Sequence, residues 1–177
     1  MSSRQLQAHA AQLSRRSRLL FLGGLCAVML VYGFSVTMIG PLMPSLLGAY
    51  SLRLAGGGLV ESFRSIGGMA AALLAGGLSD RYPKAVLVAA LFAGYGITLF
   101  LIGLAPSYVL LLAVFFVLGA ATRLVDSISN ALTADLFPRS SGPALNTLHT
   151  VFGIGALIGP IFARSVLLRS GEWQRAY

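Results

Sequence analysis

Two long stretches without a charged residue constrain this chain more than any other feature. Residues 19–52 and 85–122 contain no Asp, Glu, Lys or Arg. As a single helix, residues 85–122 would be about 57 Å long at about 1.5 Å per residue, against a bilayer hydrocarbon core of about 30 Å. The tripeptide Ala105-Pro106-Ser107 therefore predicts a turn between two membrane-spanning helices.

The composition agrees with a membrane protein and excludes several other classes. Of the 177 residues, 56% are hydrophobic and only 10% are charged, whereas soluble domains carry about 25% charged residues. An ordinary cytosolic enzyme and a disordered tail are excluded, and the single Cys26 excludes a disulfide-stapled module. The net charge is +8, but Arg15, Arg16 and Arg18 directly precede an apolar stretch. This arrangement is typical of the flank of a membrane helix rather than a nucleic-acid surface, so we expect a lipid bilayer and no nucleic acid as partner.

We therefore predict an all-α integral membrane protein. Its five transmembrane helices are expected at about 19–47, 56–79, 85–105, 108–135 and 143–167. Residues 1–18 are expected to form a cytoplasmic tail, residues 19–168 the helical bundle, and residues 169–177 an outer loop leading to a missing sixth helix.

The distribution of basic residues predicts the orientation. With the N-terminus inside, seven Lys or Arg side chains fall in cytoplasmic segments and three in outer segments. Short cytoplasmic loops are enriched in Lys and Arg, so we expect the N-terminus inside and the protein in the plasma membrane.

Ionisable side chains within the predicted spans are the candidate functional residues, because a charge at the bilayer centre is costly. Arg123, Asp126 and Asn130 share one stripe of the fourth span at helical spacing. The functional interpretation is a cavity-facing stripe that binds a solute, with Asp126 also a candidate for carrying a proton. The structural alternative is a self-neutralising ion pair. A cation beside Asp126 favours the ionised carboxylate, and burial favours the protonated form. If the cation dominates, transport would be uniport, exchange or coupled elsewhere. Alternatively, a solute that competes for Arg123 would release Asp126 and couple binding to protonation.

Other polar groups in the spans are less decisive. Glu61 and Arg64 in the second span have ion-pair spacing, and a gating pair and a local structural pair are equally weighted. Asn146 and His149 share a face of the fifth span, and we expect them to line a solute pathway. Three residues of the first span are weaker candidates for such a path: Tyr32, Ser35 and Thr37.

Several positions are expected to have structural roles. Close helix contacts are predicted at Gly155 and Gly159, and along a small-residue ridge formed by Gly68, Ala72 and Gly76. Aromatic anchors at the membrane interface are expected at Tyr108, Trp173 and Tyr177. The chain has no phosphate-cradling loop, metal cluster or nucleophile–base arrangement, so we expect no enzyme and no cofactor.

The loop after the second span carries a recognisable pattern, Gly76-Gly77-Leu78-Ser79-Asp80-Arg81-Tyr82-Pro83-Lys84. It resembles the signature loop between helices 2 and 3 of the major facilitator superfamily. The matching residues are Gly76, Leu78, Asp80, Arg81 and Lys84, whereas Pro83 and Ala85 depart from the family pattern. Asp126 with Asn130, and Leu145-Asn146 with His149, are similar to the pattern of the fucose-permease branch, which are sugar–proton symporters.

This resemblance implies a secondary active transporter that moves a small polar solute, a sugar, by alternating access. It implies a major-facilitator-type bundle in which the chain supplies five helices of an incomplete six-helix half and lacks a C-terminal half, so we expect no transport by residues 1–177 alone. Protons are candidate co-substrates, but Gly40 occupies the place of the proton-titrating Asp in helix 1 of the fucose permeases.

Two other functions remain open. Gly155-x-x-x-Gly159-Pro160 resembles part of the helix-5 signature of drug antiporters, so a multidrug or metabolite antiporter is one alternative. The other is a non-transporting membrane fragment or helper protein.

Overall fold

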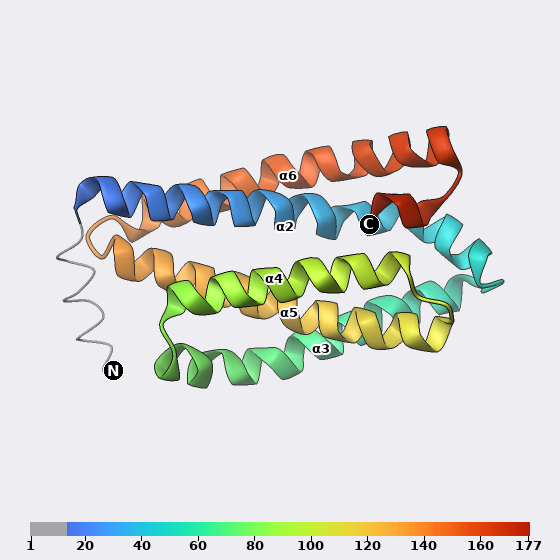
Figure 1. Ribbon diagram of the computed structural model, residues 1–177, viewed down its shortest axis with the longest axis horizontal. Helices are drawn as coiled ribbons and strands as arrows, with labels where there is room; N and C mark the ends of the chain where they lie inside the picture. The colour runs from blue at the N-terminus through green and yellow to red at the C-terminus, as the bar shows by residue number, and fades with distance from the viewer. Residues whose placement is uncertain (1–13) are drawn as a thin grey trace.

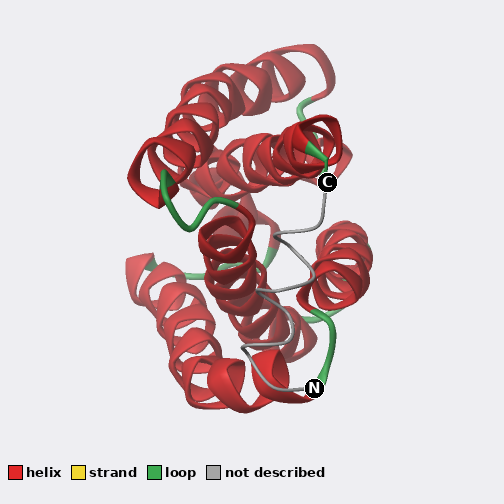
Figure 2. Ribbon diagram, turned by 90° about the vertical axis from the view of Figure 1, so that its left-hand side faces the viewer, coloured by secondary structure: helices red, strands yellow, loops and turns green. Residues whose placement is uncertain are grey.

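The computed structural model of the protein describes residues 14–177, so most of the predicted cytoplasmic tail lies outside the described residues. In the described residues all regular structure is helical (Figures 1 and 2). The elements in chain order are α2 (Arg15–Ala49), α3 (Leu54–Arg81), α4 (Lys84–Gly103), α5 (Tyr108–Leu136), α6 (Ser141–Ser170) and the short 3₁₀ helix η1 (Trp173–Ala176).

Local chemistry accounts for the helix ends. The Ser14 and Ser107 hydroxyls accept hydrogen bonds from the backbone N–H groups of Ser17 and Leu110, which caps the starts of α2 and α5. The turn predicted at Ala105–Ser107 separates α4 from α5. Helix α6 ends at Gly171, whose φ of 68° suits a residue without a Cβ atom.

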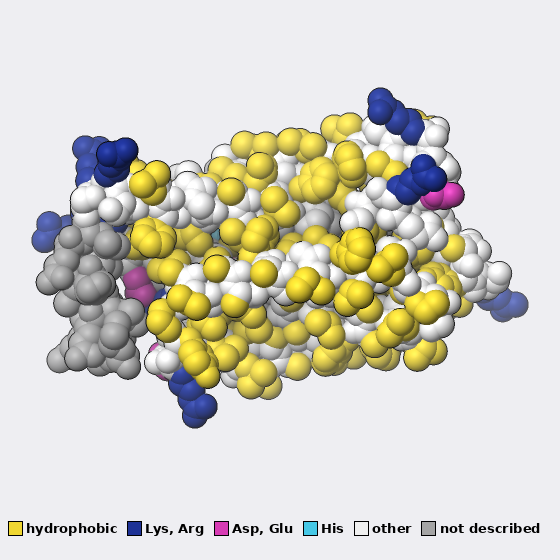
Figure 3. Space-filling model, in the orientation of Figure 1, with side chains coloured by type: hydrophobic (Ala, Val, Ile, Leu, Met, Phe, Trp, Pro, Cys, Tyr) yellow, Lys and Arg dark blue, Asp and Glu magenta, His cyan; other side chains and the backbone are white. Residues whose placement is uncertain are grey.

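The helices suit a membrane environment. Helices α2, α4, α5 and α6 are each long and apolar enough to cross a bilayer. Helix α3 has 28 residues but falls below that apolarity, because it contains the charged Glu61 and Arg64 and several glycines. Charged side chains gather at both ends of the bundle, and hydrophobic side chains cover the middle of the visible face (Figure 3). The predicted all-α membrane bundle with five long helices is confirmed.

The helices pack in a definite pairing. Helix α2 packs mainly along α6, α3 packs mainly along α5, and α4 packs against α5 (Figure 1). Consecutive helices run in opposite directions, so α2 and α6 are parallel, as are α3 and α5. A large buried core between the helices includes Tyr95, Phe115 and Leu42.

Glycines set the two closest helix contacts. A methyl group on Gly119 would overlap the Arg64 carbonyl oxygen, and one on Gly67 would overlap the Phe116 carbonyl oxygen. On the other pair, Gly155 and Gly159 of α6 approach the backbone of α2 in the same way, as predicted.

The small-residue ridge predicted on α3 is only partly confirmed: Gly68 packs against α5, where a methyl group would lie 3.4 Å from the Gly119 carbonyl oxygen. Ala72 and Gly76 are exposed, and a methyl group on Gly76 would meet nothing within 4 Å. Gly67 and Ala71 are the buried small residues instead. The prediction holds at Gly68 and is wrong at Ala72 and Gly76, because glycines stand in pairs at 67–68 and 76–77 and periodicity alone does not choose between them.

The end of the chain packs into the bundle. Trp173 is buried, and its ring lies 6.3 Å from that of Tyr50. The prediction that Trp173 anchors the membrane interface is therefore wrong, because η1 folds back and places this side chain in the main core. The predicted outer segment 169–177 thus contributes to packing at this end of the bundle.

Candidate functional site

A polar cavity of about 300 Å³ lies between three helices. We call it the polar cavity. Its lining consists of Tyr32 from α2, Arg64, Ser65, Gly68 and Met69 from α3, and Gly119, Thr122 and Arg123 from α5. Polar surface exceeds apolar surface in this lining, which is unusual within an otherwise apolar bundle.

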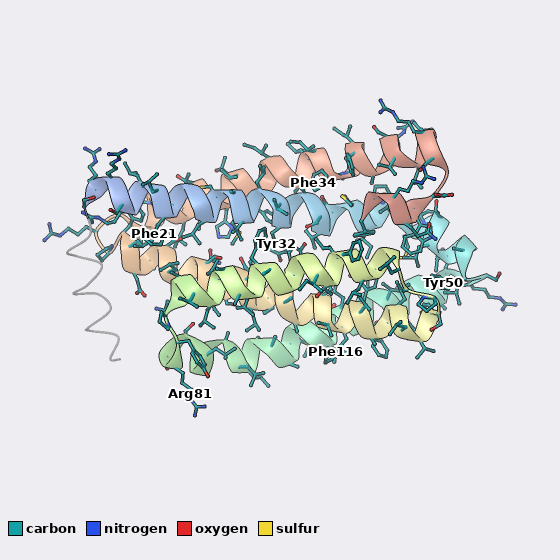
Figure 4. All side chains as sticks on the ribbon, in the orientation of Figure 1. Phe21, Tyr32, Phe34, Tyr50, Arg81 and Phe116 are labelled. Atoms are coloured by element: carbon teal, nitrogen blue, oxygen red, sulfur yellow. The ribbon has the colours of Figure 1, made fainter. Side chains whose placement is uncertain are left out.

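The polar cavity lies halfway along the bundle. Tyr32 is the central residue of α2, and Thr122 is the central residue of α5. Gly68 lies at the centre of α3. Figure 4 shows Tyr32 at mid-length of α2, far from Arg81 at the end of α3. A bundle that crosses a bilayer therefore holds this cavity near the membrane midplane.

Arg64 enters the cavity already paired. Its Nε and Nη2 atoms donate to Glu61 Oε2 over 2.9 and 2.7 Å. The predicted pair of Glu61 and Arg64 is thus formed within α3. The same close approach of Gly119 to the Arg64 carbonyl group holds this part of α3 against α5. Arg64 shares this cavity with Arg123, which the sequence does not predict because the two residues belong to different helices.

The predicted stripe on α5 is also present. Asn130 Nδ2 donates to Asp126 Oδ1 over 3.1 Å, and Arg123 Nη1 lies 3.9 Å from Asp126 Oδ2. At that distance Arg123 and Asp126 form an ion pair but no hydrogen bond. The Arg123 side chain is 54% exposed and the Asp126 side chain 24% exposed. Arg123 therefore lies in the cavity, and Asp126 and Asn130 follow one and two turns farther along α5.

Two polar atoms beside Asp126 are buried without a partner in the described residues. They are Asn130 Oδ1 and Ser129 Oγ. Buried polar groups are hydrogen-bonded in most folded proteins, and exceptions often mark functional positions.

Asn146 and His149 are not brought to the polar cavity. Both side chains are exposed on α6, whose buried face instead carries Ala144, Leu148 and Gly155. Their place in a solute pathway stays a prediction.

Of the weaker candidates in α2, only Tyr32 lines the cavity. Ser35 is hydrogen-bonded to Tyr95 in the core, and Thr37 donates to the Ala156 carbonyl oxygen over 3.1 Å. These two hydroxyls therefore join α2 to its neighbours rather than line a path. The rotation of α2 about its axis decides which of these three hydroxyl groups faces the cavity.

The predicted signature loop separates into two parts. Asp80 and Arg81 are exposed, and Arg81 extends away from the bundle (Figure 4). Gly76 is exposed and Leu78 is half-buried. Lys84, at the start of α4, forms a salt bridge with Asp135, at the end of α5. The sequence does not predict a role for Asp135, because its partner lies 51 residues away along the chain.

The sequence matches a known protein family over most of its length. The model of the Major Facilitator Superfamily matches residues 25–177. The chain belongs to this superfamily. The resemblance predicted from the loop at Gly76–Lys84 is confirmed.

The chain is similar to glucose transporters and to a multidrug resistance protein. The chain is 28% identical over 138 residues to the sodium-dependent glucose transporter 1A of Mus musculus, which covers 78% of this chain and 32% of that protein. It is 23% identical over 143 residues to the sodium-dependent glucose transporter 1 of Homo sapiens, covering 81% of this chain and 28% of that protein. It is 37% identical over 105 residues to the multidrug resistance protein MdtG of Yersinia enterocolitica, covering 59% and 25%. The chain thus spans about a third or less of the length of these relatives.

In this superfamily member, we expect the salt bridge between Lys84 and Asp135 to stabilise one end of the bundle. Lys84 stands at a helix N-terminus and Asp135 near a helix C-terminus, so each charge opposes the dipole of its own helix and relies on the other. The two side chains are 16% and 21% exposed. Lys84→Met or Asp135→Leu alone should lower the free energy of unfolding by about 1–2 kcal/mol.

The double variant Lys84→Met/Asp135→Leu should regain most of that loss, because neither charge is then left without its partner. The matched control is the pair of Glu172 and Arg175, whose side chains are 58% and 64% exposed. Its removal should change the free energy of unfolding by about 0.5 kcal/mol or less. Denaturant titration in detergent measures all four variants. Equal effects at the two pairs would contradict the stabilising role.

Proposed function

We propose that this protein is a secondary active transporter that moves a small polar solute, a sugar, by alternating access. One observation carries the proposal: a polar cavity with ionisable lining lies halfway along an apolar helical bundle. Charge near the membrane midplane is costly for a protein that serves only as a scaffold, whereas transporters of this superfamily hold their solutes there. The similarity to the sodium-dependent glucose transporters of mouse and human supports a sugar as the solute.

In this proposal some residues contact the solute and others respond to its binding. Arg64, Arg123 and Tyr32 contact the solute in the polar cavity. Asp126 and Asn130 respond to its arrival through their contacts with Arg123 and with each other. The solute is released when the bundle rocks against the rest of the full-length transporter and exposes the cavity to the other side. The driving force is the solute gradient or a coupled ion, for which Asp126 is the candidate carboxylate.

The test is uptake by the full-length protein in liposomes. We expect monosaccharides from a panel containing labelled D-glucose and D-glucuronate to enter faster than into protein-free vesicles. A panel without any monosaccharide flux would contradict the proposal. Flux of ethidium alone would favour the antiporter alternative, which the match to MdtG and the Gly155/Gly159 spacing support. No flux of either class would favour the helper alternative.

We further propose that the N-terminus faces the cytoplasm and that the protein resides in the plasma membrane. The bias of seven basic residues against three supports this orientation. In a Cys26→Ser background, a cysteine at Arg81 should react with an impermeant maleimide only after the cells are permeabilised, and a cysteine at Ser170 should react in intact cells. Labelling of position 81 from outside intact cells would contradict the orientation.

A further inference from the structure

The charges that line the polar cavity are of one sign. Arg64 and Arg123 both line it, from α3 and α5 respectively, and among residues 14–177 no carboxylate is part of the lining. Glu61 and Asp126, the nearest acids along the two helices, belong to ion pairs beside the cavity rather than to its wall. A neutral solute does not require two guanidinium groups there.

The two guanidinium groups are not equally occupied. Arg64 directs Nε and Nη2 to Glu61, which leaves its Nη1 edge outside that pair. In residues 14–177, no group accepts a hydrogen bond from the Arg123 guanidinium, and the Asp126 carboxylate stays 3.9 Å away. Asp126 instead accepts a hydrogen bond from the side-chain amide of Asn130. Arg123 therefore offers its planar donor fork to whatever enters the cavity.

A guanidinium fork has a preferred partner. It matches the geometry of a carboxylate with two parallel N–H···O bonds, and such charge-assisted bonds are roughly twice as strong as neutral ones. A sugar hydroxyl occupies only part of that fork.

Hydroxyl groups complete the wall. Tyr32 and Ser65 belong to the lining, and both side chains carry a hydroxyl group. Each can donate to and accept from an alcohol. The volume of about 300 Å³ lies at the low end of the range for ligand pockets, about 300–1,000 Å³, and so suits one small solute.

We propose that the polar cavity binds a hydroxylated carboxylic acid of the sugar-acid class. The carboxylate lies on Arg123 with the Nη1 edge of Arg64 beside it, and the hydroxyls of the acid meet Tyr32 and Ser65. This inference rests on the proposed transport function and specifies its substrate class as anionic.

The first test is binding by the purified protein in nanodiscs of zwitterionic lipid, which lack competing anionic headgroups. Isothermal titration calorimetry with D-glucuronate should give saturable binding at least tenfold tighter than with D-glucose, its neutral counterpart. Equal or tighter binding of D-glucose, or no binding of D-glucuronate, would overturn the inference.

Variants locate the site. Arg123→Gln should weaken D-glucuronate binding at least tenfold, and Arg123→Lys should recover only part of the loss because it keeps the charge and loses the fork. Because Arg64→Gln alone would leave Glu61 unpaired, the double variant Glu61→Gln/Arg64→Gln tests the second cation, with a smaller loss expected.

The matched control is Arg53→Gln, in the exposed turn before α3. It removes the same charge from a chain with net charge +8 and should leave D-glucuronate binding unchanged. An equal loss in Arg53→Gln and Arg123→Gln would show that overall charge attracts the anion and would overturn the inference.

Flux separates this inference from the function on which it rests. Uptake of D-glucose without D-glucuronate by the full-length protein would overturn the substrate class and leave the sugar transporter standing. Saturable, Arg123-dependent binding of D-glucuronate without any flux would overturn the transport function and support the binding site.

Discussion

Asp126→Asn is expected to abolish or strongly impair solute flux by the full-length protein while leaving membrane insertion intact. Asp126 stands between Arg123, at 3.9 Å, and Asn130, at 3.1 Å, and is the acid beside the cavity on α5. An Asn side chain can still accept the Asn130 hydrogen bond, so the local fold should persist. The variant removes only the charge that balances Arg123. Uptake in liposomes measures the loss, and the amount of protein recovered in the membrane fraction controls for insertion.

A double variant separates a functional Asp126 from a structural one. If the contact with Arg123 only neutralises two charges, Arg123→Ala/Asp126→Ala should recover near-normal flux, because neither charge is left unpaired. If the two residues handle solute or proton, the double variant stays inactive, and this is the result we expect. Recovered flux would contradict the assignment of both residues.

Among substitutions that add one methyl group to the α3–α5 contact, Gly119→Ala is expected to be the most destabilising. The new Cβ atom would overlap the Arg64 carbonyl oxygen, and backbone cannot move aside as a flexible side chain can. Overpacking of this kind typically costs about 1–3 kcal/mol, and we expect the upper end of that range. The separation of α3 from α5 would also move Arg64 away from Arg123, so binding in the polar cavity should weaken with stability.

Gly94→Ala is the matched control, because a methyl group there would meet nothing within 4 Å. Its free energy of unfolding should be unchanged or higher by up to about 1 kcal/mol, since Ala is the better helix former. Denaturant titration and the thermal unfolding midpoint measure both variants. Equal stability of Gly119→Ala and Gly94→Ala would mean that the helix contact is looser than the structure indicates.

The ion pair within α3 and the polar stripe on α5 show what helical periodicity can predict. Glu61 with Arg64, and Arg123 with Asp126, lie three residues apart, and a helix brings such positions to one face whatever surrounds it. The family was also readable, because the loop at Gly76–Lys84 is a local pattern. The ridge on α3 and the role of Trp173 were not, since both depend on which side of a segment meets its neighbour.

The sequence by itself therefore determined the membrane environment, the five long helices and the pairs within each helix, because apolar length and a fixed helical repeat act locally. Only the tertiary structure decided that Arg64 and Arg123 line one cavity with Tyr32, and that Lys84 meets Asp135. The relative rotation and register of two helices depend on how their surfaces fit. Here Gly67 and Gly119 allow the backbones to touch at one level, and that contact selects which side chains face each other.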